Sequence, residues 1–263
     1  IDVIIEEWNG STLLDSFLLT KDTTFLKDTG VFANNPHILF VADTSFQIDQ
    51  NNEYRLEMRN NNTGLVAKAS TIIVENIVVT KPKVVQTQKI RLTGNDYQVA
   101  WEQGKNGKVH ELVIRFFWEE IDKYDPTIKE TKYVDWVFPA EVVSDPENPS
   151  PLNIVIAAES FYPFIASKIE VNPNVNRLYC HLDFIFYVGS EELYTYIQVN
   201  QPPLGIVQEK PQFSNIDGGL GLFSSRLTHI VENKKLDFDS GMELESGDLT
   251  KDLGFIGVSN GCQ

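Results

Sequence analysis

Apolar and polar residues alternate with a period of two along most of this chain. The clearest example is Glu53–Arg59, in which Tyr54, Leu56 and Met58 alternate with charged residues. Successive side chains of a β-strand point to opposite faces, so this pattern predicts a strand with one buried face in an antiparallel sheet. The polar turn Asn60–Gly64 follows, and a second apolar segment returns after it. A chain dominated by this pattern is expected to be mainly β.

The N-terminal third contains several such segments, separated by polar turns. We expect its strands at Ile1–Trp8, Ser11–Leu19, Ile38–Phe46, Glu53–Arg59, Leu65–Ser70 and Thr71–Thr80. Short strands at hairpin spacing are typical of a β-sandwich. We therefore predict an immunoglobulin-like sandwich over residues 1–82. It is expected to end near Lys81–Lys83, because the proline in that stretch disfavours a continuing strand.

Residues 83–263 are predicted to form a second, larger antiparallel β domain with one or two short helices. Its strands are expected at Tyr97–Trp101, Val109–Glu119, Lys132–Phe138 and Arg177–Val188, with further short strands over Leu236–Val258. The dipeptide Asn106-Gly107 is a strong signal for a hairpin turn between the first two. Serine can cap a helix start, so helices are expected after Ser160 and Ser190, at Phe161–Val171 and Glu191–Ile197.

The net charge of the chain argues against a nucleic-acid partner, and its short apolar runs argue against a membrane-spanning helix. The formal net charge is -15, and such a chain repels phosphate backbones, so no nucleic-acid partner is expected. No apolar run approaches the roughly 18 residues of a membrane-spanning helix. Because the chain begins at Ile1 and not at methionine, we expect that a leader segment has been removed.

The chain has two cysteines, Cys180 and Cys262. No C-x-x-C motif is present, which argues against a redox pair or a structural zinc site. Cys180 lies in an apolar, strand-like run, and Cys262 is the penultimate residue. We expect two unpaired thiols, and a disulfide between them is the alternative.

The usual catalytic and metal-binding motifs are missing from the sequence. The four histidines lack metal-ligand spacing, there is no G-x-S-x-G or P-loop, and Asp237–Gly241 matches only a fragment of a calcium loop. We therefore expect no catalytic residue, no metal and no cofactor. The tryptophans that alternate with aliphatic residues are expected in the core; these are Trp101, Trp118 and Trp136.

Two other aromatic residues are weak candidates for ligand binding. Trp8 stands beside an Asn-Gly pair, and Tyr124 lies in a polar loop. Binding residues are concentrated at such loop tips.

A glycine-rich segment, Phe213–Arg226, places three glycines within four positions. Glycines this close indicate backbone angles that other residues resist, or close approach of two chains. The segment has no following helix pattern and contains no G-x-S-x-G, so neither a phosphate cradle nor a nucleophile elbow is supported. We interpret it as a structural motif in which Leu220, Leu222 and Phe223 make apolar contacts and Arg226 supplies a pairing charge. The motif residues are Asn215, Gly218, Gly219, Gly221, Phe223 and Arg226.

Several stretches together resemble a family of surface lipoproteins from Bacteroidota that is known only as a domain of unknown function. They are Tyr54–Thr71, Glu111–Glu119, the region from Tyr194 to Arg226 with the Asn-and-glycine signature, and Leu253–Phe255. The resemblance spans nearly the whole chain and implies an immunoglobulin-like N-terminal domain. It also implies a lipid-anchored protein of the outer membrane, on the cell surface or facing the periplasm. Members often lie near genes for TonB-dependent outer-membrane transporters, and their lipidated cysteine is absent from this chain.

These observations predict a non-enzymatic cell-surface lipoprotein. It would bind a glycan or peptide ligand, or a partner such as an outer-membrane transporter, and contact the membrane only through a lipid anchor missing from this chain. Two alternatives remain open. A structural or adhesion module would be favoured by an open sheet edge or exposed apolar patches. A hydrolase with a dispersed site would be favoured by two pocket carboxylates about 5 to 10 Å apart.

Overall fold

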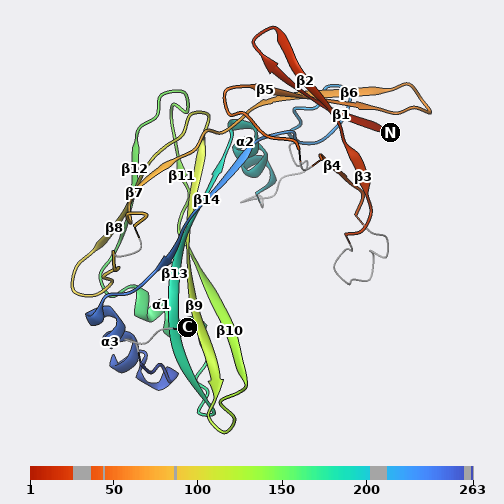
Figure 1. Ribbon diagram of the computed structural model, residues 1–263. Coiled ribbons are helices and arrows are strands. Elements are labelled where there is room, and N and C mark those ends of the chain that lie inside the picture. The colour runs from red at the N-terminus through yellow and green to blue at the C-terminus, as the bar shows by residue number, and fades with distance from the viewer. Residues whose placement is uncertain (26–36, 44, 86–87, 202–211, 258–261, 263) are drawn as a thin grey trace, which may run out of the picture. The chain divides into compact units, whose positions relative to one another are not determined.

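The computed structural model describes residues 1–25, 37–43, 45–85, 88–201, 212–257 and 262. The chain is mainly β, as predicted (Figure 1). Its internal contacts divide it into two units. Unit 1 comprises Ile1–Glu75, Asn106–Val109 and Gly189–Arg226, and unit 2 comprises Asn76–Lys105, His110–Val188 and Leu227–Gln263. The glycine-rich segment, expected in the C-terminal domain, thus groups with the N-terminal strands. The boundary near residue 82 and the immunoglobulin-like identity stay predictions.

Unit 1 is built on a four-stranded antiparallel sheet with strand order β2-β1-β5-β6. The strands are β1 (Asp2–Asn9), β2 (Thr12–Leu18), β5 (Glu53–Arg59) and β6 (Val66–Ile72). The period-two prediction for β5 is confirmed, because Tyr54 is buried while Glu53 and Arg55 form an ion pair on the opposite face. A separate small ladder pairs β3 (Thr20–Asp22) with β4 (Leu39–Val41).

Helix α2 (Glu191–Asn200) belongs to unit 1. It begins after Ser190, as predicted, and extends three residues beyond the predicted end at Ile197. Glu191 and Glu192 occupy its first turn, where the positive end of the helix dipole stabilises negative charge.

Unit 2 contains two sheets. The larger has the order β10-β9-β13-β14, with β11 also paired to β9, and the smaller has the order β12-β8-β7. The strands of the larger sheet are β9 (Val109–Asp122), β10 (Lys129–Val137), β11 (Glu141–Val142), β13 (Val175–Gly189) and β14 (Arg226–Lys234). Those of the smaller sheet are β7 (Val78–Lys81), β8 (Tyr97–Glu102) and β12 (Pro151–Ile156).

Aromatic side chains fill the space between these two sheets. Trp101 of β8 contacts Phe186 of β13 with ring centroids 5.2 Å apart, and both are almost fully buried. Trp118 is also buried, so the core prediction is confirmed for these two tryptophans. Trp136 is half-buried and stacks on Phe164 with ring centroids 5.0 Å apart.

The predicted hairpin at Asn106-Gly107 is wrong. Asn106 has a φ of 63°, as a tight turn of this kind requires. However, β8 and β9 belong to different sheets of unit 2 and do not pair. The dipeptide determines the local backbone, whereas the partner of each strand depends on which apolar faces meet across the core.

Helices replace part of the predicted C-terminal strands. Over the stretch predicted as short strands, Leu236–Val258, the chain forms α3 (Phe238–Ser246) and the 3-10 helix η1 (Lys251–Leu253). Asp237, which the sequence placed in a fragment of a calcium loop, caps α3 by accepting a hydrogen bond from the backbone N–H of Ser240 at 2.9 Å. The missed signal is therefore this N-cap.

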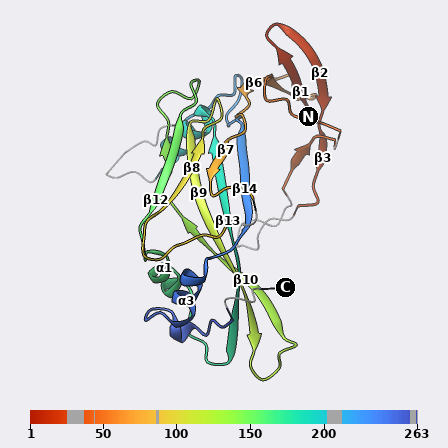
Figure 2. The same ribbon diagram turned by 60° about the vertical axis from the view of Figure 1, so that its left-hand side comes forward.

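The predicted helix after Ser160 is confirmed and ends earlier, as α1 (Phe161–Lys168). Helices α1 and α3 lie side by side at one end of the unit 2 strands (Figures 1 and 2). The hydroxyl of Tyr162 in α1 donates a hydrogen bond to the carbonyl of Ser240 in α3 at 3.1 Å.

Cys180 and Cys262 form a disulfide, so the expectation of two unpaired thiols is wrong. Residues 254–256 run beside β13: the N–H of Arg177 donates to the carbonyl of Gly254, and the N–H of Ile256 donates to the carbonyl of Arg177. This pairing brings the C-terminal residues near β13, which the 82-residue separation of the two cysteines gave no reason to expect.

Within the described part of the chain, none of the helices has the length and apolarity needed to span a membrane.

Candidate functional site

The glycine-rich segment lies along the outer edge of β6. The backbone groups of Lys68 and Asp217 exchange two hydrogen bonds, with N-to-O distances of 2.9 and 2.7 Å. At Gly218, a Cβ atom would lie 2.5 Å from the carbonyl oxygen of Val66, and φ is +73°. Both the close approach and the positive φ exclude other residues at this position. Gly219 is tight as well, since its Cβ would lie 3.1 Å from the Ile216 side chain.

Side chains within the segment hold its shape. The amide of Asn215 accepts a hydrogen bond from the N–H of Phe223 at 2.9 Å and donates one to its carbonyl at 2.6 Å. The Ser214 hydroxyl accepts from the N–H groups of Ile216 and Gly221. The segment is therefore held in one conformation by its own polar groups. Leu220 is 83% exposed, so its predicted apolar contact is wrong.

Ser225 joins the end of the segment to the chain that follows β6. Its hydroxyl accepts a hydrogen bond from the N–H of Val74 at 3.1 Å and donates one to the carbonyl of Ile72 at 2.7 Å. Arg226 is exposed and begins β14. The segment is thus attached to β6 through Asp217 and to the chain at the end of β6 through Ser225. It forms a wall beside one face of the unit 1 sheet.

A groove of about 620 Å³ lies between this wall and the charged face of the sheet. Strands β1, β5 and β6 supply most of its lining, and the glycine-rich segment supplies the rest. The lining residues are Glu6, Trp8, Glu53, Arg55, Leu56, Glu57, Lys68, Ala69, Ser70, Asn215 and Asp217. The groove brings together one sequence-predicted candidate, Trp8, and one residue of the predicted structural motif, Asn215.

Trp8 and Arg55 form the centre of this groove. The Arg55 guanidinium lies 4.2 Å from the centroid of the Trp8 ring, a cation–π distance. The indole N–H donates to Glu6 at 2.9 Å, and Arg55 donates to both oxygens of Glu53 at 3.2 and 2.9 Å. Trp8 therefore lies within β1 as a half-buried, oriented ring and not at a loop tip, where the sequence placed it.

The paired carboxylates of the groove are held in their charged form. A hydrogen bond from Arg55 lowers the pKa of Glu53, and hydrogen bonds from Lys68 and Arg59 lower the pKa of Glu57. General acid catalysis at neutral pH requires a carboxyl group whose pKa is raised. These two glutamates have the opposite shift, so they suit recognition of a ligand better than proton transfer.

Tyr124 is 84% exposed in the turn between β9 and β10. The backbone N–H of Tyr124 donates to the side chain of Asp122 at 2.7 Å, which shapes this turn. Tyr124 belongs to unit 2 and Trp8 to unit 1. The two sequence-predicted aromatic candidates therefore do not share a site within either unit.

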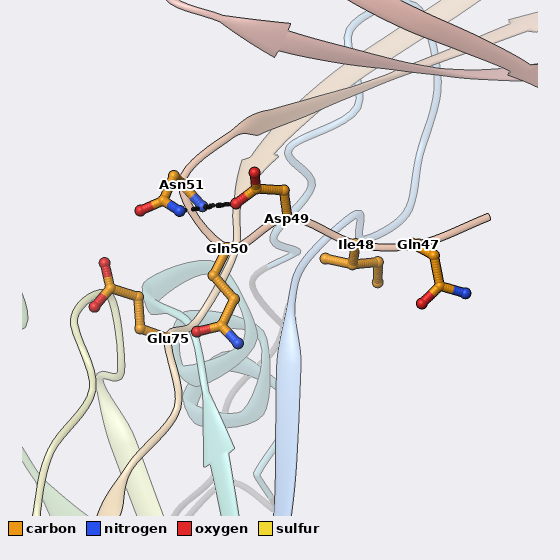
Figure 3. Close-up of a pocket in the computed structure, with 6 residues that line it drawn as sticks. All are labelled: Gln47, Ile48, Asp49, Gln50, Asn51 and Glu75. Carbon is orange, nitrogen blue, oxygen red and sulfur yellow. Dashed lines mark hydrogen bonds between the residues drawn. The ribbon is translucent and has the colours of Figure 1, made fainter.

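A second hollow of unit 1, about 450 Å³, is lined by Gln47–Asn51 and Glu75 (Figure 3). Two of its polar residues, Asp49 and Asn51, shape the loop. Asp49 accepts two hydrogen bonds from Asn51, and the N–H of Asp49 donates to the buried hydroxyl of Tyr54. Burial raises the pKa of Tyr54 to about 12, so this hydroxyl stays protonated and donates to Glu7 at 3.0 Å. The hollow is best explained as a structural turn.

A hollow of about 350 Å³ in unit 2 contains a charged network. Arg177, with a side chain only 3% exposed, donates to Glu120 at 2.9 Å and to the carbonyls of Glu170 and Leu253. Lys132 contacts the same carboxylate at 2.6 Å. Each donor is occupied by the fold, so this network is structural.

No group of histidine, cysteine and acidic residues suited to a metal ion is present in the part of the chain that the structure describes. His110 is buried and accepts a hydrogen bond from the Trp101 indole at 3.3 Å, which gives it a place in the core of unit 2.

No protein-family model matches this chain, and no curated protein sequence matches it either. The geometry of the groove is therefore the main guide to function.

Proposed function

We propose that this protein is a non-enzymatic binding protein of the cell envelope and that the unit 1 groove takes its ligand, a peptide or a glycan. The observation that carries the proposal is the oriented Trp8 ring in a polar groove with one conformationally locked wall. The volume of about 620 Å³ lies within the range of ligand sites, roughly 300–1,000 Å³. Sites built on strands position their side chains more precisely than sites on loops.

The disulfide supports a location outside the cytoplasm, because disulfides form and persist in oxidising compartments. A lipid anchor and an outer-membrane transporter as partner belong to the proposal through the family resemblance of the sequence. Co-purification of the anchored protein from membranes, with mass spectrometry of its partners, tests this part. Recovery of no outer-membrane protein would remove the transporter from the proposal.

Substitution of Trp8 tests the ligand groove. We expect Trp8→Ala to abolish binding of the best peptide or glycan found by array screening, because Trp8 is the one aromatic residue among those that line the groove. The matched control is Tyr124→Ala, which removes an exposed aromatic ring from the other unit. Calorimetric titration measures affinity, and a thermal melt of each variant checks folding. Unchanged affinity in Trp8→Ala would place the ligand elsewhere.

An adhesion or structural module is a second candidate, favoured by the edge strand β2. Leu13, Leu14 and Leu18 are 46%, 53% and 68% exposed on this strand. Exposed apolar side chains on a sheet edge are typical of surfaces that pair with another chain. Binding of whole cells to the immobilised protein, lost on substitution of these leucines with Thr, would favour adhesion over ligand capture.

A further inference from the structure

The charges that line the unit 1 groove are not balanced. Four carboxylates line it, those of Glu6, Glu53, Glu57 and Asp217, against the two cations Arg55 and Lys68. Both cations are already committed, because Arg55 pairs with Glu53 at 2.9 Å and Lys68 pairs with Glu57 at 2.9 Å. The groove therefore has a net charge of -2 when all its acidic residues are ionised.

Two carboxylates account for this excess. Among the residues that the structure describes, no cation lies within ion-pair distance of Glu6 or Asp217. They come from different parts of the chain, since Glu6 is in β1 and Asp217 is in the glycine-rich wall. The backbone pairing of Asp217 with Lys68 holds its position on the wall.

Arg55 is an example of a cationic side chain bound by the residues of this groove. Its guanidinium lies over the Trp8 ring and donates two hydrogen bonds to Glu53. An indole face attracts a cation through its quadrupole, and a carboxylate accepts the donors of a guanidinium at its edge. Glu6 accepts a hydrogen bond from the Trp8 indole, and neither Glu6 nor Asp217 has an ion-pair partner among the described residues, so both carboxylates can accept charge-assisted hydrogen bonds from a cationic side chain of a ligand.

From these observations we infer that the groove binds a basic peptide segment, with lysine or arginine side chains directed at Glu6 and Asp217. This inference rests on the proposed function and names its ligand class. The net charge of the whole chain, -15, acts in the same direction by raising the local concentration of a cationic partner.

The experiment titrates the protein with short synthetic peptides that differ only in charge. One alternates lysine with serine, and its counterparts carry glutamine or glutamate in place of lysine. We expect the lysine peptide to bind at least tenfold more tightly than the glutamine peptide, and the difference to shrink as salt rises, because exposed ion pairs are screened.

Charge-removing variants locate the interaction. Glu6→Gln retains an acceptor for the Trp8 indole, and Asp217→Asn leaves the backbone pairing intact. Each is expected to weaken binding of the lysine peptide about two- to fivefold, the effect of one exposed ion pair. The matched control is Asp248→Asn, which removes one charge at a side chain that is 97% exposed in unit 2. It should leave affinity unchanged.

The outcomes separate this inference from the proposed function. Equal binding of the lysine and glutamine peptides would overturn the inference, as would an equal loss of affinity in Asp248→Asn, which would indicate a general charge effect. If a neutral oligosaccharide binds and Trp8→Ala abolishes that binding, the groove is a ligand site and only the basic-peptide inference fails. If no ligand responds to Trp8→Ala, the proposed function fails as well.

Discussion

At the scale of single residues, the glycines of the segment Phe213–Arg226 have different roles. The sequence marks all three glycines equally, whereas the structure shows that Gly218 has the least space. Its missing side chain lets the segment approach the carbonyl of Val66, while Gly221 has only one side-chain atom within 4 Å of its Cβ position. The contact with β6 therefore decides which glycine matters most, and that contact joins positions about 150 residues apart in the chain.

We predict that Gly218→Ala destabilises the protein more than Gly10→Ala does. Both glycines have a positive φ, which costs alanine roughly 1–2 kcal/mol. Nothing lies within 4 Å of a Cβ at Gly10, whereas the Cβ at Gly218 would overlap a backbone oxygen. Urea denaturation should show an additional loss of about 1 kcal/mol or more for Gly218→Ala. Equal losses in the two variants would contradict the close approach.

At the scale of secondary-structure elements, alternation was a reliable guide, and of the two predicted turns Asn60–Gly64 joins paired strands whereas Asn106-Gly107 does not. The strands predicted at Glu53–Arg59, Val109–Glu119 and Arg177–Val188 correspond to β5, β9 and β13, because burial of one face imposes the period of two. Helix α3 was missed, since its apolar residues are few and its buried face includes Ser240 and Gly241. The start of α3 is specified by one capping residue, Asp237, and an aspartate in this position also fits a surface turn.

That cap can be tested directly. Asp237→Ala removes the acceptor for the N–H of Ser240, and we expect a loss of about 1 kcal/mol in the free energy of unfolding. Asp237→Asn is the matched control, because asparagine caps helices about as well as aspartate. Thermal and urea denaturation of both variants provide the comparison. If asparagine destabilises as much as alanine, the charge near Arg91 and not the cap accounts for the effect.

At the scale of the whole molecule, each of the two units combines segments that are far apart in the sequence. Unit 1 takes in residues 189–226 as well as the N-terminal strands, and the disulfide ties the C-terminal end of unit 2 to β13. Two residues that line the candidate site, Trp8 and Asn215, were already singled out from the sequence. The sequence did not bring them together, because Trp8 reaches the groove through β1 and Asn215 through the segment docked on β6.

We predict that Cys262→Ser lowers the free energy of unfolding by about 2–5 kcal/mol. The bond closes a loop across a sequence separation of 82 residues, which restricts the unfolded chain strongly. Denaturation with and without a reducing agent measures the effect. The reductant should destabilise the natural chain and leave the variant unchanged. A natural chain that is insensitive to reductant would show that the bond contributes little to stability.

The sequence by itself determined the β class, most strand positions, the starts of α1 and α2, and the unusual nature of the glycine-rich segment. Period-two burial and closely spaced glycines are local properties that act within a few residues. The helices do begin after Ser160 and Ser190, although neither serine side chain makes a capping hydrogen bond. Only the tertiary structure decided that β8 and β9 lie in different sheets, that Cys180 meets Cys262, and that Trp8 and Asp217 line one groove. Those outcomes depend on which apolar faces and sheet edges meet, and contacts between distant segments leave no mark in any single stretch of sequence.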